Sequence, residues 1–154
     1  MDPRYWTPTE RRRLQRVKTL RGLGNVGVTI LERMRHPEQE IVQICGPMTT
    51  GGLGSLEENM AQFSRAIEQA ERQGLRVFNQ IPFQGAIIRI TDHHDGKEYC
   101  VDILEVFYRR IFECGHVSRT LFLPGWQESR GARWERSFVS ELGIAAEEYP
   151  REWL

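Results

Sequence analysis

The chain has 154 residues, of which 40% are hydrophobic and 27% are charged, and its formal net charge at pH 7 is zero. This length is typical of one globular domain with a single core. No apolar run approaches the roughly 18 residues that cross a bilayer, and the N-terminus lacks the apolar segment of a secretory signal. These features exclude a membrane-spanning protein and lead us to expect a cytoplasmic one.

The three cysteines, Cys45, Cys100 and Cys114, are odd in number and are not in CxxC spacing. They predict isolated thiols in a reducing compartment, and they favour neither a disulfide framework nor a zinc site. Charge is uneven, because residues 1–36 contain nine Lys/Arg and three Asp/Glu. Without an accompanying nucleic-acid motif, we interpret this as a solvated basic helix face and do not expect a nucleic-acid partner.

Residues 1–38 are predicted to form an N-terminal helical extension. Thr7 can cap a helix, Pro8 suits its first position, and Glu10 follows three residues after the cap. We expect Gly22 and Gly24 to end this helix and a second helix to cover residues 26–35. The run from Gly22 to Gly27 fits the pattern GxGxxG, but it follows a helix, so we interpret it as a connection between helices.

Residues 39–154 are predicted to form an α/β domain. Three helices are expected in it. The first begins at the Ser55 capping box and ends near Gly74, and the other two cover residues 98–113 and 129–142. The expected strands are residues 41–45, 75–81, 86–90, 120–123 and 144–148.

Strands that alternate with helices predict a flavodoxin-like or Rossmann-like three-layer sandwich with a mostly parallel sheet of four or five strands. Ligands in such folds bind beyond the carboxyl ends of the strands, where the strand order reverses. Two loops should therefore line the site, residues 46–54 after the first strand and residues 124–130 after the strand at 120–123.

The run from Leu123 to Glu135 is the most informative local pattern. A strand leads into a glycine-containing loop and then into a helix start, whose free N–H groups attract anions. Glu135 lies about one turn inside the predicted helix. Spacing alone leaves two interpretations open, a solvated helix carboxylate and a catalytic carboxylate that faces the first loop.

The chain resembles the nucleoside 2-deoxyribosyltransferase-like superfamily. The resemblance covers about 110 residues and is based on an ordered set of short motifs, Cys45-Gly46-Pro47-Met48-Thr49, Asn59, Asn79, Leu123-Pro124-Gly125-Trp126, Ser129 and Gly131-Ala132 with Glu135. It implies cleavage or transfer at the N-glycosidic bond of a (deoxy)nucleoside or a nucleoside 5′-monophosphate, with Glu135 as the nucleophile.

The resemblance also implies which residues bind the substrate. They are Gly46, Pro47, Met48, Asn59, Asn79, Gly125, Trp126, Ser129, Arg130, Gly131 and Ala132. It implies no metal and no organic cofactor, and it implies a homo-oligomer, a dimer or larger. Trp126 would stack on the base, Trp134 would pack internally, and Trp6 and Trp153 would contact other subunits.

A second acidic group is expected, because the leaving base must be protonated or hydrogen-bonded. The better-known members carry an aspartate there, whereas this chain has Ser118 and Ser129. Asp102 is our candidate substitute, with Asp92 and Asp95 as others. A non-catalytic nucleotide-binding module and a flavin-binding redox domain are the alternatives that the same fold allows.

Two polar runs have further interpretations. The run Asp92-His93-His94-Asp95 could bind a metal, but adjacent residues seldom share one ion without distant partners, so we predict a polar surface turn. The run from Gly51 to Gly54, with Thr49, Thr50 and Ser55, could cradle a phosphate or serve as a connector.

Overall fold

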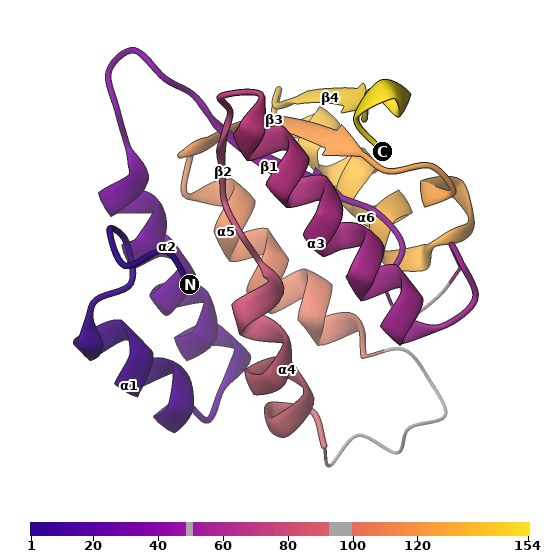
Figure 1. The fold of residues 1–154 in the computed structure, drawn as a ribbon. Helices are drawn as coiled ribbons and strands as arrows, with labels where there is room; N and C mark the ends of the chain where they lie inside the picture. The colour runs from indigo at the N-terminus through magenta and orange to yellow at the C-terminus, as the bar shows by residue number, and fades with distance from the viewer. Residues whose placement is uncertain (49–50, 93–99) are drawn as a thin grey trace.

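The computed structural model describes residues 1–48, 51–92 and 100–154. Four parallel strands form one sheet in the order β2-β1-β3-β4, and helices cover both faces in three layers (Figure 1). The strands are β1 (Ile41–Cys45), β2 (Arg76–Val77), β3 (Val117–Phe122) and β4 (Ala145–Glu148). This is a flavodoxin-like or Rossmann-like α/β fold, as the sequence predicted.

The central strands β1 and β3 form the middle of the core. Every residue of β1 is buried, and its partners on β3 run from Val117 to Phe122 with one register shift after Ile41. A strand that is buried on both faces is mostly apolar, and β1 is apolar except for Gln43, which explains why its limits could be predicted from the sequence.

Helix α3 (Leu56–Arg72) covers one face of the sheet (Figure 1). Its apolar stripe, Phe63, Ala66, Ile67 and Ala70, packs against Val42, Ile44, Leu121, Leu123 and Tyr149. Ser55 caps this helix by accepting a hydrogen bond from the Glu58 amide, as expected from the capping box. The Tyr149 hydroxyl donates to the Ala66 carbonyl oxygen at 2.8 Å and ties the C-terminal segment to α3.

The other face is covered by a larger aromatic core. The helices that contribute to it are α2 (Leu20–Met34), α4 (Gln84–Ile90), the π-helical segment η2 (Ile103–Tyr108), α5 (Arg109–Glu113) and α6 (Arg130–Glu141). The phenylalanine rings at positions 78, 83 and 107 stack in a tilted series. The short 3-10 segment η1 (Ile81–Phe83) leads into α4 and places Phe83 in this series.

The N-terminal helices share this core. Helix α1 (Pro8–Arg16) begins at Pro8 as predicted, but it ends at Arg16, and α2 already begins at Leu20. Gly24 and Gly27 therefore lie inside α2, where a Cβ at Gly27 would stand 2.4 Å from the Ile111 side chain. These glycines allow α2 to approach α5, so the interpretation of this run as a connection was wrong.

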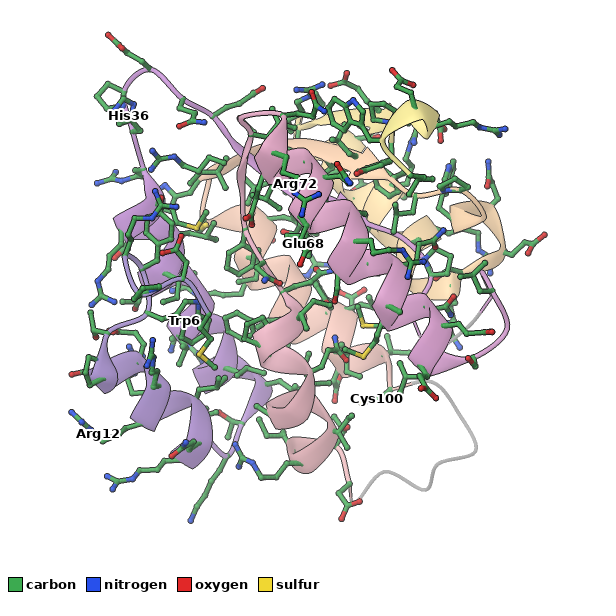
Figure 2. The ribbon with its side chains drawn as sticks, viewed as in Figure 1. Trp6, Arg12, His36, Glu68, Arg72 and Cys100 are labelled. Atoms are coloured by element: carbon green, nitrogen blue, oxygen red, sulfur yellow. The ribbon has the colours of Figure 1, made fainter. Side chains whose placement is uncertain are left out.

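Trp6 is part of the same core, although it was expected to contact another subunit. Its ring centroid lies 5.3 Å from that of Phe83, and only 4% of the residue is exposed (Figure 2). Arg12, in contrast, points outward from α1 in the same view. The boundary at residue 38 stays a prediction about folding units, but in space the first 38 residues cover the sheet together with later helices.

Two predicted strands differ in the structure. The segment 75–81 is shortened to β2, an edge strand with two paired residues, because the chain turns into η1 before Pro82. The segment 86–90 is helical: Ala86 and Ile87 are buried and Ile88 is 55% exposed. A short apolar run fits a strand and a helix equally well, and here the packing against α2 selects the helix.

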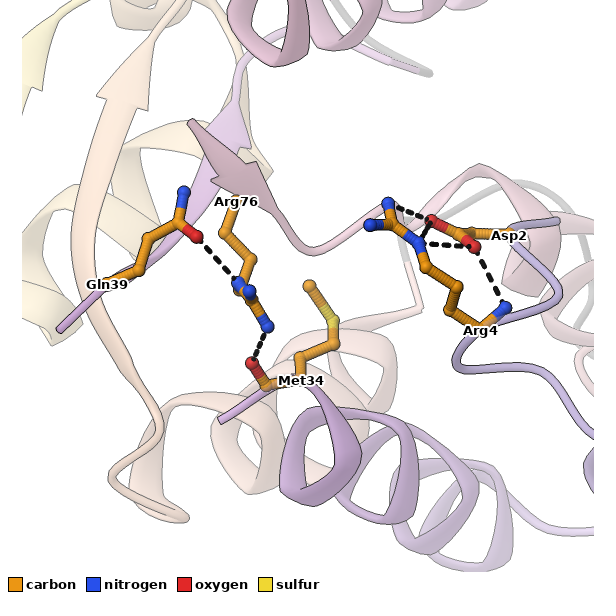
Figure 3. A network of polar contacts seen from close by, with 5 residues as sticks. All are labelled: Asp2, Arg4, Met34, Gln39 and Arg76. Carbon is orange, nitrogen blue, oxygen red and sulfur yellow. Dashed lines mark hydrogen bonds and ion pairs between the residues drawn. The ribbon is translucent and has the colours of Figure 1, made fainter. Parts of the chain in front are cut away.

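A polar network joins α2 to the edge of the sheet. The Arg76 guanidinium donates to the Met34 carbonyl oxygen at 2.5 Å and to the Gln39 side chain at 3.1 Å (Figure 3). Arg76 therefore satisfies a carbonyl group at the C-terminus of α2 and fixes the direction in which the chain enters β1.

A buried carboxylate joins α1 to α2. Glu10 is 2% exposed and forms an ion pair of 2.6 Å with Arg33, while Thr7 donates a second hydrogen bond to it. The Arg33 hydrogen bond lowers the pKa of Glu10 to about 2.

We predict that Glu10→Gln lowers the free energy of unfolding by about 1 to 3 kcal/mol at pH 7, because Arg33 loses its charged partner. The pKa of this carboxyl is lower in the folded chain than in an unfolded one, so the contribution is full above about pH 4.5 and disappears as pH falls toward 2. Urea unfolding at pH 7 and pH 3 measures it. Glu32→Gln, at an exposed site on α2, is the control, and equal losses in both variants would contradict the assignment.

Candidate active site

The candidate site lies where the carboxyl ends of β1 and β3 meet. Beyond these two strands the sheet continues to β2 on one side and to β4 on the other, so the strand order reverses between them. The Leu123 amide donates to the Cys45 carbonyl oxygen at 2.8 Å and extends the pairing by one residue. A Cβ at Gly46 would stand 2.8 Å from the Leu123 Cβ, so only glycine fits there.

Asn59 fastens the loop that follows β1. This residue is 1% exposed, and its amide nitrogen donates to the carbonyl oxygens of Met48 and Gly51 at 2.9 and 3.2 Å. Its side-chain oxygen accepts from the Leu53 amide at 2.9 Å. Asn59, on α3, therefore holds the loop in place through three hydrogen bonds. Residues 49–50 of the proposed phosphate cradle lie outside the described residues.

The loop after β1 packs against the loop after β3. Gly51, Gly52 and Gly125 all have positive φ, and a Cβ at Gly51 would stand 2.9 Å from the Glu128 carbonyl oxygen. Glycine adopts this left-handed backbone conformation without strain, and its lack of a side chain leaves room for the other loop. The two loops therefore hold each other in place.

Helix α6 begins beside these loops. A 3-10 turn, η3 (Trp126–Glu128), precedes it, and the Ser129 hydroxyl accepts from the Ala132 amide at 3.2 Å. The N–H groups in the first turn of α6 have no carbonyl partner within the helix, and they create a region of positive potential at its start. Glu135 follows one turn later on a buried face of α6.

A cavity of about 160 Å³ lies between the loop after β1, helix α4, segment η2 and the start of α6. Six of the sequence-predicted residues line it, and two loops and one helix bring them together. They are Gly46, Met48, Ser129, Gly131, Ala132 and Glu135.

The other predicted site residues do not line this cavity. Pro47 and Asn59 are buried, and Gly125 lies in the packed contact between the loops. Asn79 lines a hollow near the N-terminus, and Arg130 is exposed at the first position of α6. Asp102 is exposed and lines a different hollow with Thr19, Leu20 and Cys100, so the structure does not place it with Glu135.

Trp126, which was expected to stack on a bound base, makes its contacts with other residues of the protein. Its indole N–H donates to Glu148 at 3.3 Å, and its ring lies edge-on to Phe122. The Arg136 guanidinium carbon is 4.7 Å from the centre of the ring. Trp134 packs internally, as predicted, stacked on Phe138 with a centroid distance of 4.8 Å.

Several cavity residues could not be identified from the sequence. Segment η2 contributes Ile103, Leu104 and Tyr108, and α4 contributes Gln84, Ile87 and Ile88. Gln80, just before η1, supplies a buried amide. The π-helical turn of η2 is a structural signal, because such turns often occur at functional sites, but no pattern in the sequence indicates it.

Glu135 is a buried carboxyl group that forms no ion pair within the part of the chain that the structure describes. It is 6% exposed, and Oε2 has no hydrogen-bond partner among the described residues. Burial raises the pKa of Glu135 to about 8, although the Cys45 thiol donates a hydrogen bond that acts in the opposite direction. Burial, with the neighbouring Glu135, also raises the pKa of the Cys45 thiol well above its usual range. An isolated carboxyl with this shift is typical of a functional site.

Among the described residues, no cluster of three or more His, Cys, Asp or Glu side chains could hold a metal ion. Residues 93–95 of the Asp92–Asp95 run lie outside that part of the chain. No helix within the described ranges is long and apolar enough to cross a membrane.

We predict that Glu135→Gln stabilises the protein at pH 8 and changes its stability little at pH 5. The folded chain keeps the Glu135 proton up to about pH 8, whereas an unfolded glutamate releases it near pH 4.5. Unfolding therefore releases a proton between these values, and wild-type stability falls there by up to about 1.4 kcal/mol per pH unit. Urea unfolding at pH 5, 6.5 and 8 measures this difference. Glu141→Gln, exposed on the same helix, is the control, and parallel pH profiles for wild type and Glu135→Gln would contradict the prediction.

Comparison with known proteins connects this geometry to a family. The family model described as "Domain of unknown function (DUF4406)" matches residues 40–147, which is well over half of the chain and includes both loops and Glu135. Comparisons with curated proteins and with solved structures give no match. On the extent of the family match, this chain belongs to the DUF4406 family.

Proposed function

We propose that this protein cleaves or transfers the N-glycosidic bond of a (deoxy)nucleoside or a nucleoside 5′-monophosphate, with Glu135 as the nucleophile. One observation carries the proposal: Glu135, which lines a cavity at the reversal of strand order, has a buried carboxyl oxygen with no partner in the described ranges. Such an oxygen costs stability, and contact with a reacting carbon atom would account for its presence.

The chemistry suits a lone carboxylate. Glycosidic cleavage passes through a positively charged, oxocarbenium-like state, which a nearby anion stabilises and can trap as a covalent intermediate. Water as the acceptor would give a hydrolase, and a second base would give a transferase. In this account the Ser129 hydroxyl and the Gly131 N–H group, at the start of α6, donate to a sugar or phosphate oxygen, and Ala132 lines the same wall.

The cavity suits an aromatic ring. A cavity of about 150 Å³ can hold one benzene molecule, and this one measures about 160 Å³. Its walls include the aliphatic side chains of Leu56, Ile87, Ile88 and Leu104, and its polar groups are few. Ligand sites commonly combine apolar walls with a small number of placed polar groups.

A non-catalytic nucleotide-binding module is the second candidate. It is favoured by one observation: Glu135 is the sole acidic residue of the described cavity lining, so no second carboxylic acid is placed to protonate a base. A homo-oligomer and a cytoplasmic location complete the proposal, and gel filtration with light scattering tests the first of these.

We expect wild-type protein to release free base from at least one member of a panel of ribonucleosides, deoxyribonucleosides and their 5′-monophosphates. Chromatography with and without a second base separates hydrolysis from transfer. Glu135→Gln should lower kcat at least 1000-fold, because the amide cannot form the covalent intermediate. Glu141→Gln should retain wild-type rates. A folded wild type that binds nucleotides and releases no base would support the binding module instead.

The pH dependence should identify the reactive form of Glu135. Only the carboxylate can attack carbon, so we expect log kcat/KM to rise with a slope of about 1 and to level off near pH 8. Initial rates from pH 5 to pH 9 on the best substrate measure this. A profile that instead falls with increasing pH would assign Glu135 the role of a proton donor and would contradict the nucleophile assignment.

A further inference from the structure

The proposed reaction requires a group that stabilises the base as its bond to the sugar breaks. Asp102, the candidate from the sequence, is exposed and lines another hollow. The polar side chains in the described lining of the cavity, besides those of Glu135 and Ser129, are Gln80, Gln84, Thr91 and Tyr108. The Thr91 hydroxyl donates to the Ile87 carbonyl oxygen at 2.7 Å, whereas Gln80 is a buried amide that is held by two hydrogen bonds.

Gln80 is 3% exposed and bonded at both ends of its amide. Its Nε2 donates to the Ile44 carbonyl oxygen at 3.3 Å, and its Oε1 accepts from the Gln43 Nε2 at 2.9 Å. Exchanging the oxygen and the nitrogen would place two acceptors against each other at Ile44, so these contacts determine the orientation.

Gln43 holds this orientation from behind. It lies in the middle of β1, is fully buried, and its own Oε1 has no partner among the described residues. A buried acceptor without a partner costs stability, and an apolar side chain would fill the same position without that cost. The hydrogen bond from Gln43 to Gln80 accounts for a glutamine at this position.

An amide nitrogen carries two hydrogens, and Ile44 accepts one of them. The second N–H of Gln80 remains for a molecule in the cavity. Gln80 and Glu135 also line the same cavity of about 160 Å³. One bound molecule can therefore contact both side chains.

We propose that Gln80 donates a hydrogen bond to the leaving base, a heterocycle with a carbonyl oxygen or ring nitrogen as acceptor, and that Gln43 is the positioning residue for Gln80. This inference rests on the proposed function. The Glu135 carboxylate forms a bond to the anomeric carbon while the bond from that carbon to the base breaks. The electron pair stays on the base, and its charge spreads to the atom that accepts from Gln80.

The base then leaves as a hydrogen-bonded anion, because a neutral amide cannot transfer a proton. Solvent protonates the released base, and water or a second base displaces Glu135 from the sugar. Rates should consequently depend on the acidity of the leaving base, and the dependence should become steeper when the Gln80 donor is removed.

The test compares 5-fluoro-2′-deoxyuridine with 2′-deoxyuridine, because the fluorinated base is the more acidic leaving group. Gln80→Met, which keeps the length of the side chain but has no N–H group, should lower kcat on 2′-deoxyuridine about 100-fold. It should slow 5-fluoro-2′-deoxyuridine less, so the rate ratio between the two substrates rises. Gln43→Met should raise the ratio by a smaller factor without changing a cavity residue.

Gln73→Met, at an exposed site after α3, is the matched control and should leave both rates unchanged. Urea unfolding establishes that each variant is folded, and Gln43→Met provides the test if Gln80→Met is not. Unchanged rates and an unchanged ratio in the folded variants, with active wild type, would overturn this inference alone. Wild type that cleaves neither these substrates nor any other of the panel would overturn it together with the proposed function.

Discussion

The parallel pairing of β1 with β3 is the constraint on which the candidate site depends. This pairing brings together the ends of two strands that are separated by more than 70 residues in sequence. A hydrogen bond from the Leu123 amide to the Cys45 carbonyl oxygen extends the pairing by one residue. The contact is so close that position 46 has no room for a side chain. Both loops, the start of α6 and the carboxyl of Glu135 take their places from this pairing.

The site is built at a cost that the rest of the fold must offset. Glu135 and Gln43 are buried, and each has one oxygen atom with no hydrogen-bond partner among the residues that the structure describes. Each such atom costs about 1 to 3 kcal/mol. The aromatic core around Phe83 and the Glu10–Arg33 ion pair act in the opposite direction. The N-terminal helices supply part of both, so they stabilise the layer that encloses the cavity.

The sequence predicted those parts of the fold that local physics determines. The limits of β1 followed from an apolar run that only Gln43 interrupts, and the start of α3 followed from the Ser55 capping box. The start of α6 was expected at position 129, and the Ser129 hydroxyl caps it. The helical form of residues 86–90 could not be predicted, because tertiary packing decides it. Gly22 and Gly24 were expected to end a helix, but both lie inside α2, where Gly24 and Gly27 allow it to approach α5.

The site followed the same rule. Two short runs next to strand ends supply four of the residues that line the cavity, Gly46, Ser129, Gly131 and Glu135. At such positions a local sequence pattern can indicate a site. Gln80 and Tyr108 come from segments whose place at the cavity depends on how α4 and η2 pack. Asp102 was chosen for its chemistry alone, and packing directs it to another surface.

The account depends on one property, a carboxyl group at position 135 that stays protonated at neutral pH until a substrate or a higher pH ionises it. The most direct measurement is carbon NMR of protein labelled at the glutamate side-chain carboxyl, with the Glu135 signal assigned by its loss in Glu135→Gln. We predict that this signal titrates near pH 8 in the free protein. A Glu135 carboxyl that titrates near pH 4.5, like an exposed glutamate, would contradict the account.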